Sequence, residues 1–172
     1  MSRHYTASTR DRIGDLVTGL RADTTVGNAA TYLTSVQTNF FTLYGRIMIM
    51  EMYIEVITAL GANATTVQFK YVSATPVITV QNLSDASTDD LTSAAAGDRM
   101  NYVGGAVTGV PTVSATPGVG DEHCADPIIL GLESGVGYIT VTCAGADATQ
   151  GTIQASIHYV PMSDGAYVIG TW

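Results

Sequence analysis

The chain has 172 residues and a net charge of −8; 46% of its residues are hydrophobic and only 13% are charged. A chain of this length normally forms one domain with a sizeable core. The acidic balance argues against nucleic-acid binding, because that affinity comes mainly from Lys and Arg on phosphates. No apolar run reaches the roughly 18 residues of a membrane span. The charged start MSRHYTASTRDR lacks the apolar stretch of a signal peptide, so we expect neither membrane insertion nor secretion.

The N-terminal residues 1–39 are predicted to form an arm on the main domain. Apolar residues recur there at the spacing of one helical face, which predicts a short helix over about residues 8–21; they are Ile13, Leu16, Val17 and Leu20. The remainder, to residue 39, is polar and is expected to be extended. Residues 1–23 carry four arginines against three aspartates, whereas residues 24–172 carry three basic residues against twelve acids. A basic arm on an acidic body could dock onto an acidic neighbour, or it could be a solvated tail.

The stretch GRIMIMEMYIEVITAL, residues 45–60, is predicted to be a long strand at the start of the body. Its charged residues exclude a transmembrane helix, and its many β-branched residues favour a strand over a soluble helix. With a period of two, Met48, Met50 and Met52 fall on one apolar face and are expected to fill the core. Three thioethers on one face could also bind Cu(I), but core packing is the favoured interpretation. The other face needs cover at Ile47 and Ile49, and it needs water or a partner at Glu51, Tyr53 and Glu55.

Further segments alternate between apolar and polar residues, as half-buried strands do. We expect strands at 65–73, 77–80, 137–145, 151–161 and 166–172, and short strands with tight turns within 101–120. Residues 81–98 form a polar excursion with one helical turn near 89–96. The predicted fold is therefore all-β, an antiparallel β-sandwich or jelly-roll-like barrel of about eight strands over residues 40–172.

No arrangement of residues predicts catalysis, so we do not expect an enzyme or a bound cofactor. The best candidate metal cluster is His123 and Cys124 with the acids around them, but no second spaced pair of ligands supports zinc. His158 is expected on the outer face of a strand. Cys143 is expected to be a small core residue; a Cys124–Cys143 disulfide is left open.

Several segments in order resemble a family of virion structural proteins of tailed bacteriophages. They are the leader RDRIGDLVTGLRADTTVGNAATYLTSVQTNFFTLYGRI, the strand IEVIT, a middle rich in Gly, Pro and Thr, and the ending IHYVPMSDGAYV. The resemblance covers both ends of the chain better than its middle. The ending departs from the family pattern, because Ala155, Ile157 and His158 stand where larger aromatic residues often occur.

The resemblance implies a decoration or cement protein that coats and stabilises a capsid. Its expected partners are the major capsid protein and further copies of the chain, as a homotrimer, with no nucleic acid, membrane or small-molecule substrate. Its expected location is the capsid surface of the virion, after assembly in the host cytoplasm. The residues expected to make protein contacts are Arg3, Arg10, Arg12, Ile13, Leu16, Val17, Leu20, Arg21, Phe40, Phe41 and Tyr44.

Two other functions remain open from the residues. One is a tail or tail-tube structural protein. The other is a carbohydrate-binding β-sandwich module, for which Tyr102, Tyr138 and Trp172 are the candidate aromatic platforms.

Overall fold

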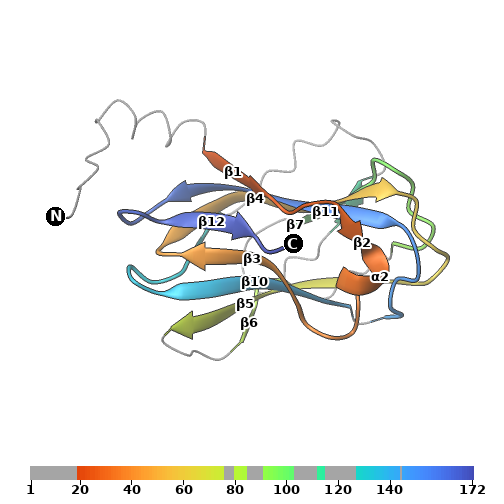
Figure 1. Cartoon of the computed structure of the whole chain (residues 1–172), viewed down its shortest axis with the longest axis horizontal. Coiled ribbons are helices and arrows are strands. Elements are labelled where there is room, and N and C mark those ends of the chain that lie inside the picture. Colours follow the sequence, from red (N-terminus) through yellow and green to blue (C-terminus); the bar gives the residue numbers. More distant parts are fainter. Residues whose placement is uncertain (1–18, 76–79, 85–90, 103–111, 115–126, 144) are drawn as a thin grey trace.

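In the computed structural model of the chain, two antiparallel sheets pack face to face as a β-sandwich (Figure 1). The structure describes residues 19–75, 80–84, 91–102, 112–114, 127–143 and 145–172. The predicted all-β sandwich is confirmed. Within the described residues there is one helix, the single-turn α2 (Ala29–Tyr32), whose Ala30 N–H donates to the Asn28 side chain. No helix in these residues is long and apolar enough to cross a membrane.

The first sheet has seven strands, and β4 and β11 form its centre. Its main order is β1 (Leu20–Asp23), β11 (Thr152–Pro161), β4 (Ile47–Thr58), β7 (Arg99–Tyr102) and β8 (Thr112–Ser114). Two short strands complete it: β2 (Gly27–Asn28) pairs with β11, and β9 (Ile128–Leu130) pairs with β4. We call this sheet A.

The second sheet, sheet B, has five strands. Their order is β12 (Tyr167–Gly170), β3 (Thr38–Tyr44), β10 (Val136–Cys143), β5 (Val67–Thr75) and β6 (Gln81–Asn82). Across both sheets, eight strands have four residues or more, and one of them, β1, lies in the segment that was predicted to be an arm. The residues predicted to face inward on three long strands are buried; they are Val67, Phe69, Tyr71, Ile139, Val141, Cys143, Ile153, Ala155, Ile157 and Tyr159. Thr140 and Ser156, which alternation places on the outward side, are buried as well.

The prediction that Met48 and Met50 fill the core is wrong. In β4 the buried residues are Ile47 and Ile49 at the start and Met52 further along, while Met48 and Met50 are half-buried. The cause is a β-bulge: the pairing with β11 skips Met50, so the inward face changes from odd to even positions there. Ile47 and Ile49 therefore need no cover from outside, because they lie in the core. Of the three methionines, Met52 alone is confirmed as a core residue.

A second irregularity buries two neighbouring residues of β3. Phe40 and Phe41 are each only 1% exposed, although adjacent residues in a regular strand face opposite sides. The pairing of β10 with β3 shifts between Ile139 and Thr140 and leaves Phe40 out of the ladder. Phe40 then packs edge-on against Trp172, with ring centroids 5.3 Å apart.

The predicted helix over residues 8–21 is wrong at its C-terminal end. Leu20 and Arg21 belong to β1, which pairs with β11; residues 8–18 lie outside the described residues. Within β1, Leu20 and Ala22 pack against the core while Arg21 and Asp23 are exposed. The positions of the apolar residues here are compatible with a strand as well as with one face of a helix. The pairing with β11 favours the strand.

Residues 20–39 are therefore part of the sandwich rather than an arm beside it. Backbone hydrogen bonds join Thr24 to Ala155 and Thr25 to Trp172. Figure 1 shows β1 running beside β12, and an added side-chain atom at Gly170 would meet the backbone of Asp23. The N- and C-terminal strands thus close one side of the molecule together.

Some of the smaller predictions lie partly outside the described residues. Residues 91–96 of the predicted helical turn form turns and no helix, and Val80 is not in a strand. Residues 76–79, 85–90, 103–111 and 115–126 lie outside the described residues. The end of the chain forms the predicted last strand, β12.

Candidate protein-interaction face

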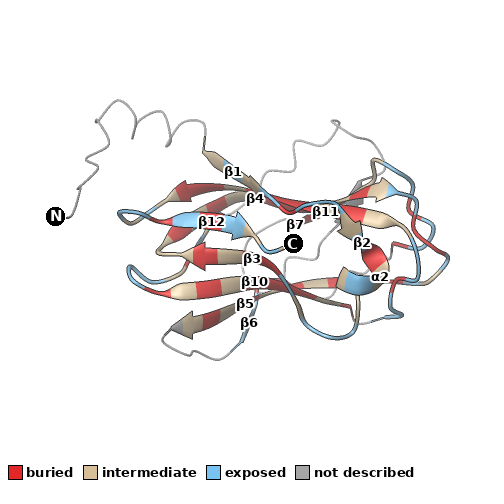
Figure 2. Ribbon diagram, in the orientation of Figure 1, coloured by how far each residue is buried: buried red, intermediate tan, exposed pale blue. Residues whose placement is uncertain are grey.

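The outer face of sheet B carries a group of aromatic and aliphatic side chains, two of which are about half exposed. In β12, Tyr167 is 44% exposed and Ile169 is 48% exposed, while Val168 between them is buried. Figure 2 shows the exposed residues of β12 at the edge of this sheet, next to strands with alternating buried positions. Alternation along β12 therefore directs two large apolar side chains outward.

Tyr167 lies directly opposite Tyr44 of β3. Their rings are stacked, with centroids 4.6 Å apart and an angle of 15° between the planes. Cross-strand aromatic pairs of this kind stabilise a sheet by roughly 0.2–1 kcal/mol. The two rings therefore form one joined aromatic surface on this edge of the sheet.

The next row of the same face runs across four strands. Ile169 is opposite Thr42, Thr42 is opposite Tyr138, and Tyr138 is opposite Val72. Apart from Ile169, the members of this row are half-buried. We call the two rows together the tyrosine face; it consists of Thr42, Tyr44, Val72, Tyr138, Tyr167 and Ile169.

The tyrosine face is almost uncharged. Lys70 of β5 is the one charged residue in the five strands of sheet B, in a chain with a net charge of −8. A flat surface rich in tyrosine and without acidic residues is typical of the core of a protein interface, where charged residues are depleted.

The outer face of sheet A is the opposite in character. Its polar side chains contact one another: Arg21 pairs with Asp23 at 2.8 Å, Arg99 pairs with Glu55 at 3.0 Å, and the His158 ring lies 3.1 Å from the Glu51 carboxylate. The hydrogen bond from Arg21 to Asp23 raises the pKa of the arginine further, so it stays charged. The guanidinium of Arg99 also lies 4.5 Å from the ring centroid of Tyr53. These groups already have partners within the chain.

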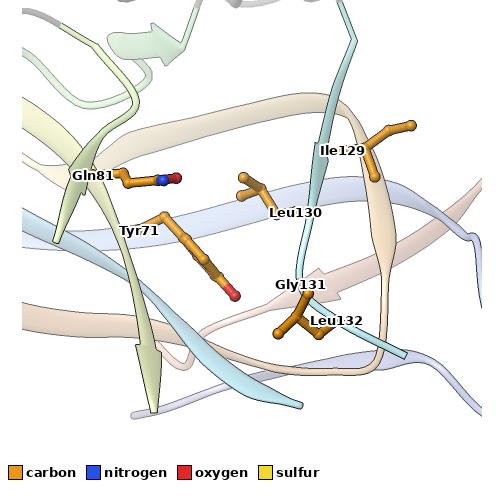
Figure 3. Close-up of a pocket in the computed structure, with 6 residues that line it drawn as sticks. All are labelled: Tyr71, Gln81, Ile129, Leu130, Gly131 and Leu132. Atoms are coloured by element: carbon orange, nitrogen blue, oxygen red, sulfur yellow. The ribbon is translucent and has the colours of Figure 1, made fainter. Parts of the chain in front are cut away.

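A small cavity of about 180 Å³ lies between the two sheets beside β6 and β9. Figure 3 shows Tyr71 and Gln81 on one side of it, facing Leu130, Gly131 and Leu132 on the other. The residues that line it include no charged side chain, and Tyr71 is the one among them with an ionisable side chain.

The structure divides the predicted contact residues into three sets. Tyr44 lies on the tyrosine face; Leu20 and Arg21 lie on β1 at the other sheet; and Phe40 and Phe41 pack in the core, with no surface for a partner in this conformation. The leader residues lie outside the described residues; they are Arg3, Arg10, Arg12, Ile13, Leu16 and Val17.

Sequence reasoning missed four members of the tyrosine face, Thr42, Val72, Tyr167 and Ile169, and it named Tyr138 only as a candidate sugar platform. The alternation Tyr167–Val168–Ile169 contained a signal, but it did not show which side faces the core. Of the candidate sugar platforms, Tyr102 is buried, and Trp172 stacks on Tyr32 with ring centroids 3.9 Å apart. Tyr138 alone of the three lies on an open face.

The candidate metal residues His123 and Cys124 lie outside the described residues. In the part of the chain that the structure describes, no three His, Cys, Asp or Glu side chains gather as metal ligands. Cys143 is a free, buried thiol, and burial raises its pKa to about 12.

Comparison of the chain with protein-family models, with curated proteins and with solved structures finds no match. Its function must therefore be argued from its own residues and their arrangement.

Proposed function

We propose that this chain is a structural virion protein of the decoration type, which attaches to a phage capsid through the tyrosine face. The observation that carries the proposal is the flat, nearly uncharged aromatic surface of sheet B, with Tyr167 and Ile169 about half exposed. The order of segments resembling tailed-phage virion proteins supports the same function.

The physical reason for binding is the burial of apolar area. Covering Tyr167 and Ile169 with a partner removes large apolar side chains from water, at roughly 25 cal/mol for each Å² of apolar surface. The stacked Tyr44 and Tyr167 lose little conformational freedom on binding, because their rings already hold each other in place. The self-paired charges of sheet A cost free energy to desolvate, so that face is the one better left in water.

The proposed partners are the major capsid protein and further copies of the chain. A homotrimer would suit the local threefold positions of a capsid, because homo-oligomers close by symmetry. The proposed location is the outer capsid surface.

The test is co-sedimentation of the purified protein with phage capsids from which this protein has been removed. The double variant Tyr167→Ser/Ile169→Ser removes the exposed part of the tyrosine face. A matched control is Val26→Ser/Val36→Ser, which removes two exposed apolar side chains elsewhere. We expect the wild type and the control to bind at a fixed ratio, and the face variant to bind at least about tenfold more weakly, equivalent to about 1.4 kcal/mol. Equal binding by the face variant would overturn the proposal.

A carbohydrate-binding function is the second candidate, and one observation favours it: Tyr138 remains on an open face beside the stacked pair. A glycan array distinguishes the two. Binding to defined sugars that is lost in Tyr138→Ala would favour it over capsid attachment. Cryo-electron microscopy of the particle would separate a head position from a tail position.

A further inference from the structure

The cavity beside Tyr71 lies where both sheets end in short strands. β6 has two residues and β9 has three, and the cavity lies between them. Tyr71 of β5 and Leu130 of β9 face it from the two sheets, and they are only 7% and 5% exposed. Ile129 and Leu132 also line it, but they are 53% and 37% exposed. The cavity therefore opens to the surface and reaches the edge of the core.

The size of the cavity suits one aromatic ring. Its volume is about 180 Å³, and an apolar cavity of about 150 Å³ can hold a benzene molecule. Three of its lining residues, Ile129, Leu130 and Leu132, are aliphatic, and Gly131 adds no side chain. The ring of Tyr71 gives the cavity an aromatic wall (Figure 3), against which a second ring can pack edge-on or offset.

The Tyr71 hydroxyl lies in this cavity without a partner. The backbone of Tyr71 pairs with Gln81 on one side and Ile139 on the other, but its hydroxyl makes no hydrogen bond with the residues that the structure describes. The hydroxyl lies against β10, because an added side-chain atom at Gly137 would be 2.5 Å from it. Figure 3 shows this end of Tyr71 directed toward Gly131. A hydroxyl in such a place gains free energy from any ligand atom that completes its hydrogen bond.

We propose that the cavity binds a phenol group, which is a benzene-sized ring with one hydroxyl. The ring lies against the aliphatic walls and Tyr71, and its hydroxyl forms a hydrogen bond with the Tyr71 hydroxyl, which can donate or accept. The Gln81 amide also faces the cavity and is a second hydrogen-bonding group. Among the described residues of the lining none is charged, so a carboxylate or an ammonium would lose its hydration without gaining a partner.

A phenol group can come from two sources, a free aromatic alcohol or a tyrosine side chain of another protein. Both present the same ring and hydroxyl to the cavity, and they differ in whether a peptide backbone is attached to the ring. The cavity shares no residue with the tyrosine face. Phenol binding therefore goes beyond the proposed function and does not depend on it.

Methyl NMR of the full chain tests the proposal, with phenol as the probe. We expect saturable shifts of the methyl signals of Ile129, Leu130 and Leu132, with a Kd on the order of 1 mM for so small a ligand. The methyl signals of Leu33, which is buried but does not line the cavity, should not move. Toluene has a similar ring but no hydroxyl, and it should bind at least about threefold more weakly. Shifts that do not saturate, or that are as large at Leu33, would overturn the proposal.

Two variants isolate the hydroxyl. Tyr71→Phe keeps the aromatic wall, and we expect it to weaken phenol binding about fivefold and to leave toluene binding unchanged. Tyr32→Phe is the matched control, because the Tyr32 hydroxyl also has no hydrogen-bond partner among the described residues and α2 does not line the cavity. The control should bind phenol as the wild type does. Equal phenol affinity in Tyr71→Phe and the wild type would show that the hydroxyl does not bind the ligand and would overturn the proposal.

The amide of N-acetyltyrosine distinguishes the two sources of the phenol group. If it shifts the same methyl signals as strongly as phenol does, the cavity receives a tyrosine side chain of a partner. If phenol alone binds, the ligand is a free aromatic alcohol, and if neither binds the proposal is wrong. Capsid co-sedimentation of Tyr71→Phe should equal that of the wild type, so a failure here is separate from a failure of the proposed function.

Discussion

Thr24 and Ala155 join the N-terminal segment to the middle of β11 by two reciprocal hydrogen bonds. The Ala155 N–H donates to the Thr24 hydroxyl oxygen at 2.9 Å, and the Thr24 N–H donates to the Ala155 carbonyl oxygen at 3.0 Å. Thr24 is 2% exposed, so neither bond can be replaced easily by water. This pair explains why the segment after residue 19 belongs to the sandwich.

Replacing Thr24 by Val keeps the shape of the side chain and removes the acceptor of the Ala155 N–H. We expect the free energy of unfolding to fall by about 1–3 kcal/mol, because a buried donor is left without a partner. Urea denaturation measures it. Thr24→Ser keeps the hydroxyl and should lose clearly less, and equal losses for Ser and Val would show that packing rather than the hydrogen bond matters.

Two truncations should behave differently. Removing residues 1–18 leaves β1 and Thr24 in place, whereas removing residues 1–24 deletes the four pairs of β1 with β11 and both bonds of Thr24. The structure places a cut at residue 24 inside sheet A, directly after β1. We expect the longer truncation to be less stable than the shorter by about 2 kcal/mol or more. Equal urea midpoints for the two would contradict this.

Gly131 is expected to tolerate no side chain. Its φ is 86°, and an added Cβ would overlap the carbonyl oxygen of Gly45. Gly165 is a control with a similar φ of 73° but nothing within 4 Å of an added Cβ. Gly165→Ala should cost about 1–2 kcal/mol from backbone strain alone, a fall in Tm of about 2–8 °C. Gly131→Ala should lose clearly more or fail to fold, and equal falls in Tm would show that the contact with Gly45 relaxes freely.

Cys143 should make stability fall at alkaline pH. Its pKa is raised from 9.0 to about 12 in the folded chain, first by burial and then by the charge of Asp147. Between these values the unfolded chain loses the thiol proton and the folded chain keeps it, so the unfolded state binds fewer protons and stability decreases as pH rises. The contribution is complete below pH 9.0 and is lost as the pH rises through about 12.

The measurement is the urea midpoint between pH 7 and pH 10.5 for the wild type and for Cys143→Ala. Other groups titrate in this range, so the difference between the two proteins carries the result. We expect the stability gap between the wild type and the variant to narrow as pH rises. A gap that is constant with pH would show that the thiol ionises equally in both states.

Local alternation was enough to predict the long strands. In β5, β10 and β11 the apolar residues recur every second position, and pairing on either side did not alter which face is buried. The prediction failed where a partner strand changed the register. The bulges at Met50 and Phe40 arise from the pairing of β4 with β11 and of β3 with β10, which no pattern within one strand encodes.

Of the six residues of the tyrosine face, only Tyr44 was predicted from the sequence to make protein contacts. Its neighbours from β5, β10 and β12, which run from Val72 to Ile169, lie 28 to 125 positions after Tyr44 in the chain, and only sheet B places them side by side. The aromatic residues Phe40 and Phe41 were expected beside Tyr44 because they are close in sequence, but the bulge turns both into the core.

The sequence by itself determined the all-β class and the positions of the long strands, because these depend on residue types at a spacing of two. It also determined the low charge of the strands that form sheet B, which is a matter of their composition. Tertiary structure decided which sheet each segment joins and which of its residues face the core. It placed Leu20 and Arg21 in β1 of sheet A instead of a helix, turned Met48 and Met50 of β4 away from the core, and gathered three tyrosines from distant strands on one open face. Strand order and register depend on contacts between residues far apart in the chain, and hydrophobic burial, which drives these contacts, is non-directional until the sheets have formed.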